Sequence, residues 1–206
     1  MAGSDTIIKK YNIIILAAGA STRLGEPKQL LRYGNVNLVQ HAVMEARATD
    51  AKGVVVVVGS SAEQIIKSVE NKGAKIVRNE KWSEGIGSSI RTGVEFVARD
   101  TEVDGVILMV CDQPYVSTAF LNELIAHQHS SKEPIVAAQY KDTVGTPALF
   151  HRSFFPALQE LHGDAGAKKI MLDHSSEVYK VKFPLGDIDI DTRNDYEMLV
   201  KKNSEA

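Results

Sequence analysis

Apolar runs alternate with stretches of helical periodicity along most of the chain. The runs predict strands at residues 11–17, 53–58, 74–78, 106–111 and 134–139, with shorter ones near 148–150 and 178–183. Helical spacing predicts helices near residues 38–46, 60–71, 88–99, 120–125, 152–161 and 165–173, and a last one from Thr192. Ser60 with Glu63, and Thr192 with Asp195, have the spacing of helix N-terminal caps. Five consecutive valines at 54–58 indicate a strand covered on both sides.

This alternation predicts the fold class. Strands separated by helices of 10 to 15 residues are typical of a doubly wound α/β fold, with a mostly parallel sheet and helices on both faces. A chain of 206 residues with 44% hydrophobic composition favours one domain over residues 1–206, with residues 1–6 as a tail. Such sheets bind ligands at the carboxyl ends of their strands, so each loop after a strand is a candidate site.

Composition excludes several classes of protein. A net charge of −2 without a basic block argues against nucleic-acid binding. The single cysteine, Cys111, excludes an internal disulfide and a multi-cysteine zinc site, and it fits the cytoplasm. No stretch reaches the roughly 20 apolar residues of a membrane helix. The apolar run at 13–20 follows Lys9 and Lys10 as in a signal peptide, but its length and the alternation after it favour a buried first strand.

The loop after the first expected strand is the first candidate site. Residues 15–31 read ILAAGASTRLGEPKQLL, and Gly19 and Gly25 match neither the dinucleotide-binding motif nor the Walker A motif. The loop nevertheless combines a flexible start with two cations, Arg23 and Lys28, and phosphate oxygens bind such groups. The alternative is a mobile surface loop whose charges are solvated.

Carboxylates form the second candidate site. Asp112, in the stretch ILMVCDQP, ends a buried strand, where a Mg²⁺ ligand is expected; the alternative is a turn or helix-capping aspartate. Asp187, Asp189 and Asp191 alternate in GDIDIDTRND, so in a strand they would point to the same side. A solvated acidic face explains the alternation equally well.

Together these motifs resemble a known family. The pattern L-A-A-G-x-S-x-R-x-G-x-P-K-x-L-L at residues 16–31 is similar to the nucleotidyltransferase motif of the molybdopterin cytidylyltransferase group, which is related to the molybdopterin guanylyltransferases. The stretches NEKWSEGIGSSIRTG, CDQP, GTPALF, GDAGAKKIM and DIDT follow in the family's order, and the resemblance covers about residues 12–200. Leu24, Lys168 and Arg193 depart from the common pattern without removing a charged group.

The resemblance implies a single-domain, Rossmann-like nucleotidyltransferase that moves CMP from CTP to the phosphate of the molybdenum-bearing pterin and releases pyrophosphate. It implies Arg23 on the β and γ phosphates and Lys28 on the α phosphate. Asp112 and Asp191 would hold Mg²⁺, with Asp189 in reserve. Ala18, where guanylyltransferases more often have glycine, favours cytidine. The alternatives are the same chemistry with GTP or on a sugar-phosphate acceptor, and a non-catalytic carrier or insertion partner for the cofactor.

The resemblance assigns binding roles to further positions; for Ser88, near the start of an expected helix whose N–H groups could meet an anion, contact with nucleotide or with pterin stays open. The implied nucleotide-binding residues are Leu16, Ala17, Ala18, Gly19, Ser21, Arg23, Lys28, Arg78, Asn79 and Ser88. The implied acceptor-binding residues are Gly145, Thr146, Gly163, Asp164 and Gly166. A molybdenum hydroxylase or its maturation factor is the implied protein partner. Two residues are given structural interpretations: Cys111 as a packed thiol, and Trp82 as a loop anchor, with stacking on a pterin or base as its alternative.

Overall fold

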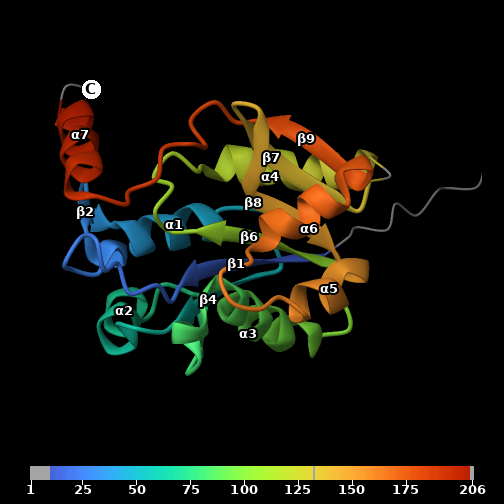
Figure 1. The fold of residues 1–206 in the computed structure, drawn as a ribbon, viewed down its shortest axis with the longest axis horizontal. Helices are drawn as coiled ribbons and strands as arrows, with labels where there is room; N and C mark the ends of the chain where they lie inside the picture. The colour runs from blue at the N-terminus through green and yellow to red at the C-terminus, as the bar shows by residue number, and fades with distance from the viewer. Residues whose placement is uncertain (1–9, 132, 205–206) are drawn as a thin grey trace, which may run out of the picture.

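The computed structural model describes residues 10–131 and 133–204, so the expected tail at residues 1–6 lies outside the described residues. Its main sheet has the order β5-β4-β1-β6-β8-β7-β9 (Figure 1). The strands are β1 (Tyr11–Ala17), β4 (Gly53–Val58), β5 (Lys75–Arg78), β6 (Gly105–Val110), β7 (Ile135–Tyr140), β8 (Thr143–His151) and β9 (Val178–Lys182). Only β8 runs antiparallel to its neighbours in this sheet. The mostly parallel sheet predicted from the sequence is confirmed.

Helices cover both faces of the sheet, as a doubly wound fold requires. The helices on one face are α1 (Leu38–Arg47), α2 (Ala62–Val69) and α4 (Thr118–Ser130). Those on the other face are α3 (Ile86–Ala98), α5 (Phe155–Gln159) and α6 (Ala167–Asp173). The last helix, α7 (Arg193–Ser204), stands apart at one end of the molecule beside the small sheet of β2 (Arg32–Tyr33) and β3 (Val36–Asn37) (Figure 1).

The alternation of side chains along β1 divides the core into two clusters. Ile13 and Ile15 pack with α1, α2 and α4, whereas Ile14 and Leu16 pack with α3. The valine run does the same, and all five valines are at most 3% exposed. A side chain at Gly93 of α3 would meet Ile14, so the glycine lets this helix approach the sheet closely. The central position expected for the valine strand is confirmed.

Two local expectations differ from the structure, and one small element was not expected. Ser60 and Glu63 form no capping box: the Ser60 N–H donates to the Ala18 carbonyl and α2 begins only at Ala62, with no side-chain cap. The β2–β3 hairpin is not apparent from hydrophobic periodicity, because its strands have two residues each. Residues 187–191 form turn and irregular structure instead of a strand, so pleat alternation does not place their aspartates. The cap at Asp195 is confirmed, since its carboxylate accepts from the Thr192 N–H at 2.8 Å.

The single thiol is packed as the sequence indicates. Cys111 is 4% exposed in the core beneath α1 and α4, and burial, with a further contribution from Asp112, raises its pKa to about 12. Among the residues that the structure describes, no helix is long and apolar enough to cross a membrane.

Cys111 is therefore expected to resist thiol reagents in the folded protein. At pH 8, a pKa of about 12 leaves roughly 10⁻⁴ of the side chain as the reactive thiolate, and the core shields it further. Titration with a chromogenic disulfide should detect no thiol before unfolding and one thiol per chain in denaturant. Labelling of the folded protein at the rate of a free cysteine would contradict this packing.

Candidate active site

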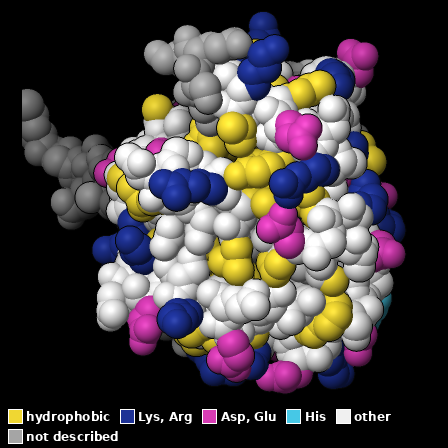
Figure 2. All heavy atoms as spheres, turned by 90° about the vertical axis from the view of Figure 1, so that its left-hand side faces the viewer, with side chains coloured by type: hydrophobic (Ala, Val, Ile, Leu, Met, Phe, Trp, Pro, Cys, Tyr) yellow, Lys and Arg dark blue, Asp and Glu magenta, His cyan; other side chains and the backbone are white. Residues whose placement is uncertain are grey.

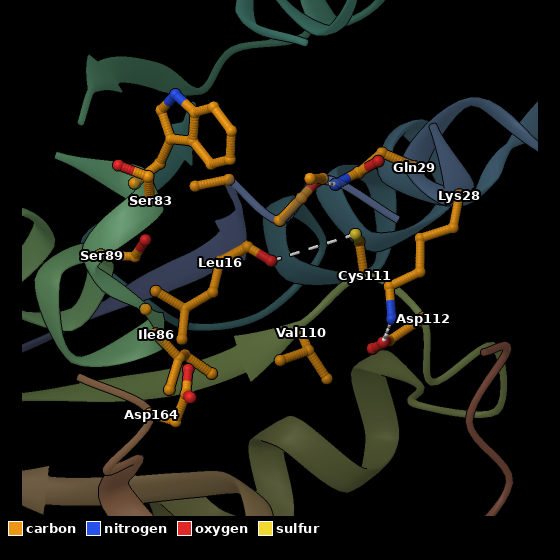
Figure 3. A pocket seen from close by; sticks show the side chains of 15 residues that line it. Leu16, Lys28, Gln29, Ser83, Ile86, Ser89, Val110, Cys111, Asp112 and Asp164 are labelled. Atoms are coloured by element: carbon orange, nitrogen blue, oxygen red, sulfur yellow. Dashed lines mark hydrogen bonds and ion pairs between the residues drawn. The ribbon is translucent and has the colours of Figure 1, made fainter. Parts of the chain in front are cut away.

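A cleft of about 340 Å³ opens where β1 and β6 end (Figure 3). Its lining residues are Leu16, Ala18, Gly19, Ala20, Lys28, Gln29, Trp82, Ser83, Gly85, Ile86, Ser89, Val110, Cys111, Asp112 and Asp164. A hollow of about 160 Å³ adjoins the cleft and shares Gly19 and Lys28 with it; its other lining residues are Ser21, Thr22, Arg23 and Asp191. The cleft is largely apolar, whereas the hollow is polar and charged, so the two parts suit different portions of one ligand.

The loop after β1 is folded back on itself by Gln29. This side chain is 1% exposed and donates through Nε2 to the carbonyl oxygens of Ala17 at 3.2 Å and Gly19 at 2.8 Å. Ser21, which has a φ of 52°, accepts at Oγ from the Lys28 N–H at 3.0 Å. These contacts fix the backbone of Lys28, which opens a short 3₁₀ turn at Lys28–Leu30. Gln29 was missed by sequence reasoning, where its only signal is a polar position before two leucines.

Lys28 links two acids that lie far apart in the sequence. Its ammonium group contacts Asp112 Oδ2 and lies 2.9 Å from Asp191 Oδ1 (Figure 3 shows the contact with Asp112). Arg23 Nη2 lies 3.4 Å from Asp191 Oδ2. The side chains of Lys28 and Asp112 are 19% and 13% exposed, against 71% for Arg23. The structure thus brings four residues predicted for the site together in one place.

The chain before α7 is fastened directly to Asp112. The N–H of Ile190, which is fully buried, donates to the Asp112 carbonyl at 3.0 Å. Asp195, at the start of α7, accepts from the Asp191 N–H at 3.3 Å. Asp189 and Asp191 therefore flank a buried residue that is hydrogen-bonded to Asp112. Asp187 is directed elsewhere, since its carboxylate pairs with Lys141 at 2.6 Å.

The pKa shifts reflect this crowding of charge. Burial lowers the pKa of Lys28, but attraction and hydrogen bonds from Asp112 and Asp191 outweigh burial and raise it above its usual range. The hydrogen bond from Lys28 lowers the pKa of Asp191. Desolvation by the groups around its carboxylate, and then the negative charges of Asp112 and Asp191, raise the pKa of Asp189 to about 6, although the residue itself is exposed. All three carboxylates therefore lie within electrostatic range of one another.

One carboxylate oxygen in this cluster has no protein partner. Asp112 Oδ1 is buried and accepts no hydrogen bond, which is costly for a charged group. A divalent cation would satisfy this oxygen, and Mg²⁺ usually takes one or two protein carboxylates beside substrate phosphates. Within residues 10–131 and 133–204, no three His, Cys, Asp or Glu side chains form a ready-made metal cage. The donor set fits a metal that binds with a substrate rather than a structural ion.

The opposite wall of the cleft consists of two segments in close contact. One is the 3₁₀ turn Trp82–Glu84 with the start of α3, and the other is the loop at 161–166. Gly85, with a φ of 98°, would place any side chain against the Gly163 carbonyl and Asp164. The Gly87 N–H donates to that same carbonyl at 3.0 Å. The glycines allow this approach, which brings the Asp164 carboxylate to the edge of the cleft (Figure 3).

Arg91 on α3 joins these two segments. Its Nη1 donates to the Leu161 carbonyl at 2.5 Å and to His162 Nδ1 at 2.9 Å, while Nη2 lies 3.1 Å from Glu84 Oε2. The side chain is only 16% exposed. Arg91 does not line the cleft, so we assign it a positioning role for the wall that contains Trp82 and Asp164.

Replacement of Arg91 by leucine is expected to raise the KM about tenfold and to leave kcat within about threefold. The wall would lose its order in the free protein, so part of the binding energy would be used to restore it; tenfold corresponds to about 1.4 kcal/mol. Steady-state rates of the nucleotidyl transfer that the sequence resemblance implies measure both constants. Arg99→Leu, at the exposed end of α3, is the matched control. A fall in kcat with an unchanged KM would contradict the positioning role.

The structure separates the implied nucleotide-binding residues into two groups. Those lining the cleft or the hollow are Leu16, Ala18, Gly19, Ser21, Arg23 and Lys28. Those lining neither are Ala17, Arg78, Asn79 and Ser88. Arg78 pairs with Glu63 at 2.7 Å, and Asn79 is buried and donates to Ser88 Oγ at 2.8 Å. The Ser88 hydroxyl also reaches the Gly85 carbonyl, so its side chain supports the start of α3. Ser89, one residue on, lines the cleft instead.

The implied acceptor-binding residues are also divided. Asp164 lines the cleft, whereas Gly145, Thr146, Gly163 and Gly166 do not. Gly145 lies against the Tyr140 hydroxyl, and Thr146 Oγ1 donates to Gln113 Oε1 at 3.3 Å. Ser83 and Ile86 are cleft residues that sequence reasoning missed, and both lie within the stretch NEKWSEGIGSSIRTG.

The sheet is doubly wound, and the loop after its first strand brings two cations to acids that follow β6 and precede α7. This combination is typical of the nucleotidyltransferase class. The model of the MobA-like NTP transferase domain matches residues 13–178. The chain belongs to this family. The resemblance to molybdopterin nucleotidyltransferases is thereby confirmed at the level of the family.

Several known proteins are similar to this chain. Nicotine blue oxidoreductase of Paenarthrobacter nicotinovorans is 30% identical over 171 residues, which cover 80% of this chain and 82% of that protein. Purine catabolism protein PucB of Bacillus subtilis is 27% identical over 201 residues, covering 90% and 94%. A probable molybdenum cofactor guanylyltransferase of Bacillus cereus is 27% identical over 131 residues, covering 63% and 62%.

Solved structures share the whole fold. Rv0371c from Mycobacterium tuberculosis superimposes with a TM-score of 0.81 at 30% identity, covering 94% of this chain and 99% of that one. A complex of Rv0371c with manganese gives a TM-score of 0.78 at 29% identity and the same coverage.

Proposed function

We propose that this protein transfers CMP from CTP to the terminal phosphate of a molybdopterin-type acceptor, with Mg²⁺ and with release of pyrophosphate. The observation that carries the proposal is the meeting of Arg23 and Lys28 with Asp112 and Asp191 beside one cleft. A carrier of a finished cofactor has no use for cations and acids combined in this way. Family membership supports the nucleotidyl transfer, while the base and the acceptor are part of the proposal.

The reaction places definite demands on the site. An oxygen of the acceptor phosphate attacks the α-phosphorus of the nucleotide, a new P–O bond forms, and the bond to the β-phosphate oxygen breaks, so pyrophosphate leaves with the electron pair. Negative charge on the equatorial and leaving oxygens must be neutralised. The attacking phosphate is already ionised near pH 7, so no general base is needed.

Residues of the cleft and the hollow are assigned to these demands. The polar hollow shared by Arg23 and Lys28 suits the triphosphate, with Arg23 on the β and γ phosphates and Lys28 on the α phosphate. Mg²⁺ would be held by Asp112 and by Asp191, or by Asp189 in its place, and would supply neutralisation of phosphate charge. The apolar cleft from Leu16 to Asp164 suits planar rings, and Asp164 is proposed on the acceptor side.

The choice of cytidine and of a molybdenum-bearing acceptor rests on sequence resemblance, with Ala18 as the residue that favours cytidine. The names of PucB and of the Bacillus cereus guanylyltransferase connect relatives with purine catabolism and with molybdenum cofactor. A molybdenum hydroxylase or its maturation factor is the proposed recipient of the product.

Figure 2 shows basic and acidic side chains interspersed with hydrophobic ones on the end of the molecule that carries α7.

A thermal-shift screen is the first test of the proposal. CTP, GTP, ATP and UTP are each added with Mg²⁺, and NADPH serves as a further arm because one relative is named an oxidoreductase. A ligand present at 100 times its Kd stabilises the folded state by about 2.7 kcal/mol, so selective stabilisation by CTP is expected. Selective stabilisation by GTP would replace CTP in the proposal, and stabilisation by NADPH alone would overturn nucleotidyl transfer.

Turnover is tested with the purified molybdenum-bearing pterin as acceptor. Pyrophosphate release is expected with CTP and Mg²⁺, and it should stop when the divalent ion is chelated and resume when the ion is restored. Matched reactions with a sugar phosphate in place of the pterin separate the two acceptor classes. Pyrophosphate release that is undiminished by chelation would contradict the metal role of Asp112.

A further inference from the structure

We propose that Lys28 occupies the divalent-cation position in the ligand-free protein and thereby makes metal binding depend on the nucleotide. The inference rests on the proposed function, and it adds an order of binding: metal enters the site with the triphosphate or after it. Lys28 would then have two alternating partners, the acids before the nucleotide arrives and the phosphates afterwards.

The contacts of Lys28 are those that a bridging cation would make. Its ammonium group lies between Asp112 Oδ2 and Asp191 Oδ1 and is largely screened from solvent, with 19% of the side chain exposed. In the part of the chain that the structure describes, Lys28 is the one cation whose contact reaches Asp112, since Arg23 contacts only Asp191. The remaining oxygen of Asp112 has no partner, which leaves the carboxylate able to accept an ion once Lys28 withdraws.

A divalent ion and the ammonium group cannot share these oxygens. Two cations held a few ångströms apart in a partly buried site repel each other strongly. An ion that enters alone must therefore displace Lys28, whose charge is then left without a protein partner in the cleft. The nucleotide removes this penalty, because its phosphates in the adjoining hollow can receive the ammonium group.

The geometry of Lys28 permits this exchange without rearrangement of the loop. Its backbone is held by the hydrogen bond from its N–H to Ser21 Oγ, and its side chain ends in an ammonium group on four rotatable bonds. Lys28 lines both the cleft and the hollow, so a rotation of the side chain moves the charge from the acids toward the triphosphate position. Gln29 holds the loop in place while the side chain moves.

The test measures Mn²⁺ binding by electron paramagnetic resonance, with no turnover involved. Free Mn²⁺ is titrated into the ligand-free wild-type protein, into Lys28→Met and into Lys141→Met, which removes an ammonium group from Asp187 outside the site. Lys28→Met is expected to bind Mn²⁺ about tenfold more tightly than the wild type, within the 5- to 150-fold range typical of coupled sites. Lys141→Met is expected to match the wild type.

A second series is run with a CTP analogue whose α,β-bridging oxygen is a methylene group. The analogue should strengthen Mn²⁺ binding to the wild type more than it does to Lys28→Met, because the metal site of the variant is already free. Equal Mn²⁺ affinity of the folded wild type and Lys28→Met without nucleotide would overturn the inference. Lys28→Gln replaces Lys28→Met if the latter does not fold. The ligand-free titrations use neither CTP nor an acceptor. They therefore test competition between Lys28 and the metal even if the proposed function is wrong.

Discussion

Asp112→Asn is expected to lower kcat for pyrophosphate release by about 10³-fold, near the upper end for loss of one charge-stabilising group. Asparagine has nearly the same shape as aspartate but no charge, so it can neither neutralise Lys28 nor hold a divalent ion firmly. One carboxylate oxygen of Asp112 contacts Lys28, and the other has no protein partner and is free to bind a divalent ion. The variant should remain folded, because Ile190 hydrogen-bonds to the Asp112 backbone and not to its side chain. Steady-state kinetics together with circular dichroism check both statements.

Asp187→Asn is the matched control for this experiment. Asp187 belongs to the same acidic segment, but its partner is Lys141 and it lines neither the cleft nor the hollow. The control should retain the wild-type rate within about twofold, as expected for loss of one exposed ion pair. If Asp112→Asn retained wild-type turnover in Mg²⁺, the charge of Asp112 would have no role in the chemistry.

The positions of the central strands and their burial on both faces could be predicted from the sequence, because both follow from the local pattern of apolar and polar residues. β1 and β4 were placed within their observed bounds, since an apolar run between polar residues marks a strand covered on both faces. The buried face of α1 was likewise predicted from helical spacing. The long antiparallel β8 was predicted as only three residues, because its polar start at Thr143 and the glycine at 145 conceal the strand.

The site was predicted less completely because its geometry depends on contacts between distant segments. Arg23, Lys28 and Asp112 could be selected from residue type and position after a strand. The placement of Asp191 depends on Ile190 and on the α7 cap, and pleat alternation did not supply it. Gln29 and Arg91 hold the two walls of the cleft through bonds to main-chain carbonyls, and such bonds leave no pattern in one sequence.

Lys28→Met is expected to lower kcat about 10²-fold, consistent with the loss of one charged contact to the transferring phosphate. The lysine is held between acids in the free protein, so its removal has two opposite effects. The α-phosphate loses a cation that acts in the transition state, while Asp112 and Asp191 lose a competitor for the metal. The Mg²⁺ concentration that gives half-maximal rate should therefore fall even as the maximal rate falls.

Arg23→Met separates the two effects, because Arg23 is 71% exposed and does not touch Asp112. This variant should raise the KM for the nucleotide about tenfold, the loss of about 1.4 kcal/mol of binding, and change the Mg²⁺ requirement much less than Lys28→Met does, because its one contact with a metal-binding acid, Asp191, is long and exposed. Measurements of rate against Mg²⁺ at saturating CTP distinguish the two variants. If Lys28→Met instead needed more Mg²⁺ than the wild type, Lys28 would not compete with the metal for the carboxylates but would assist metal binding. A lower Mg²⁺ requirement together with a lower kcat would show that the Lys28 side chain has both roles. It would bind the carboxylates before the nucleotide arrives and the phosphates afterwards.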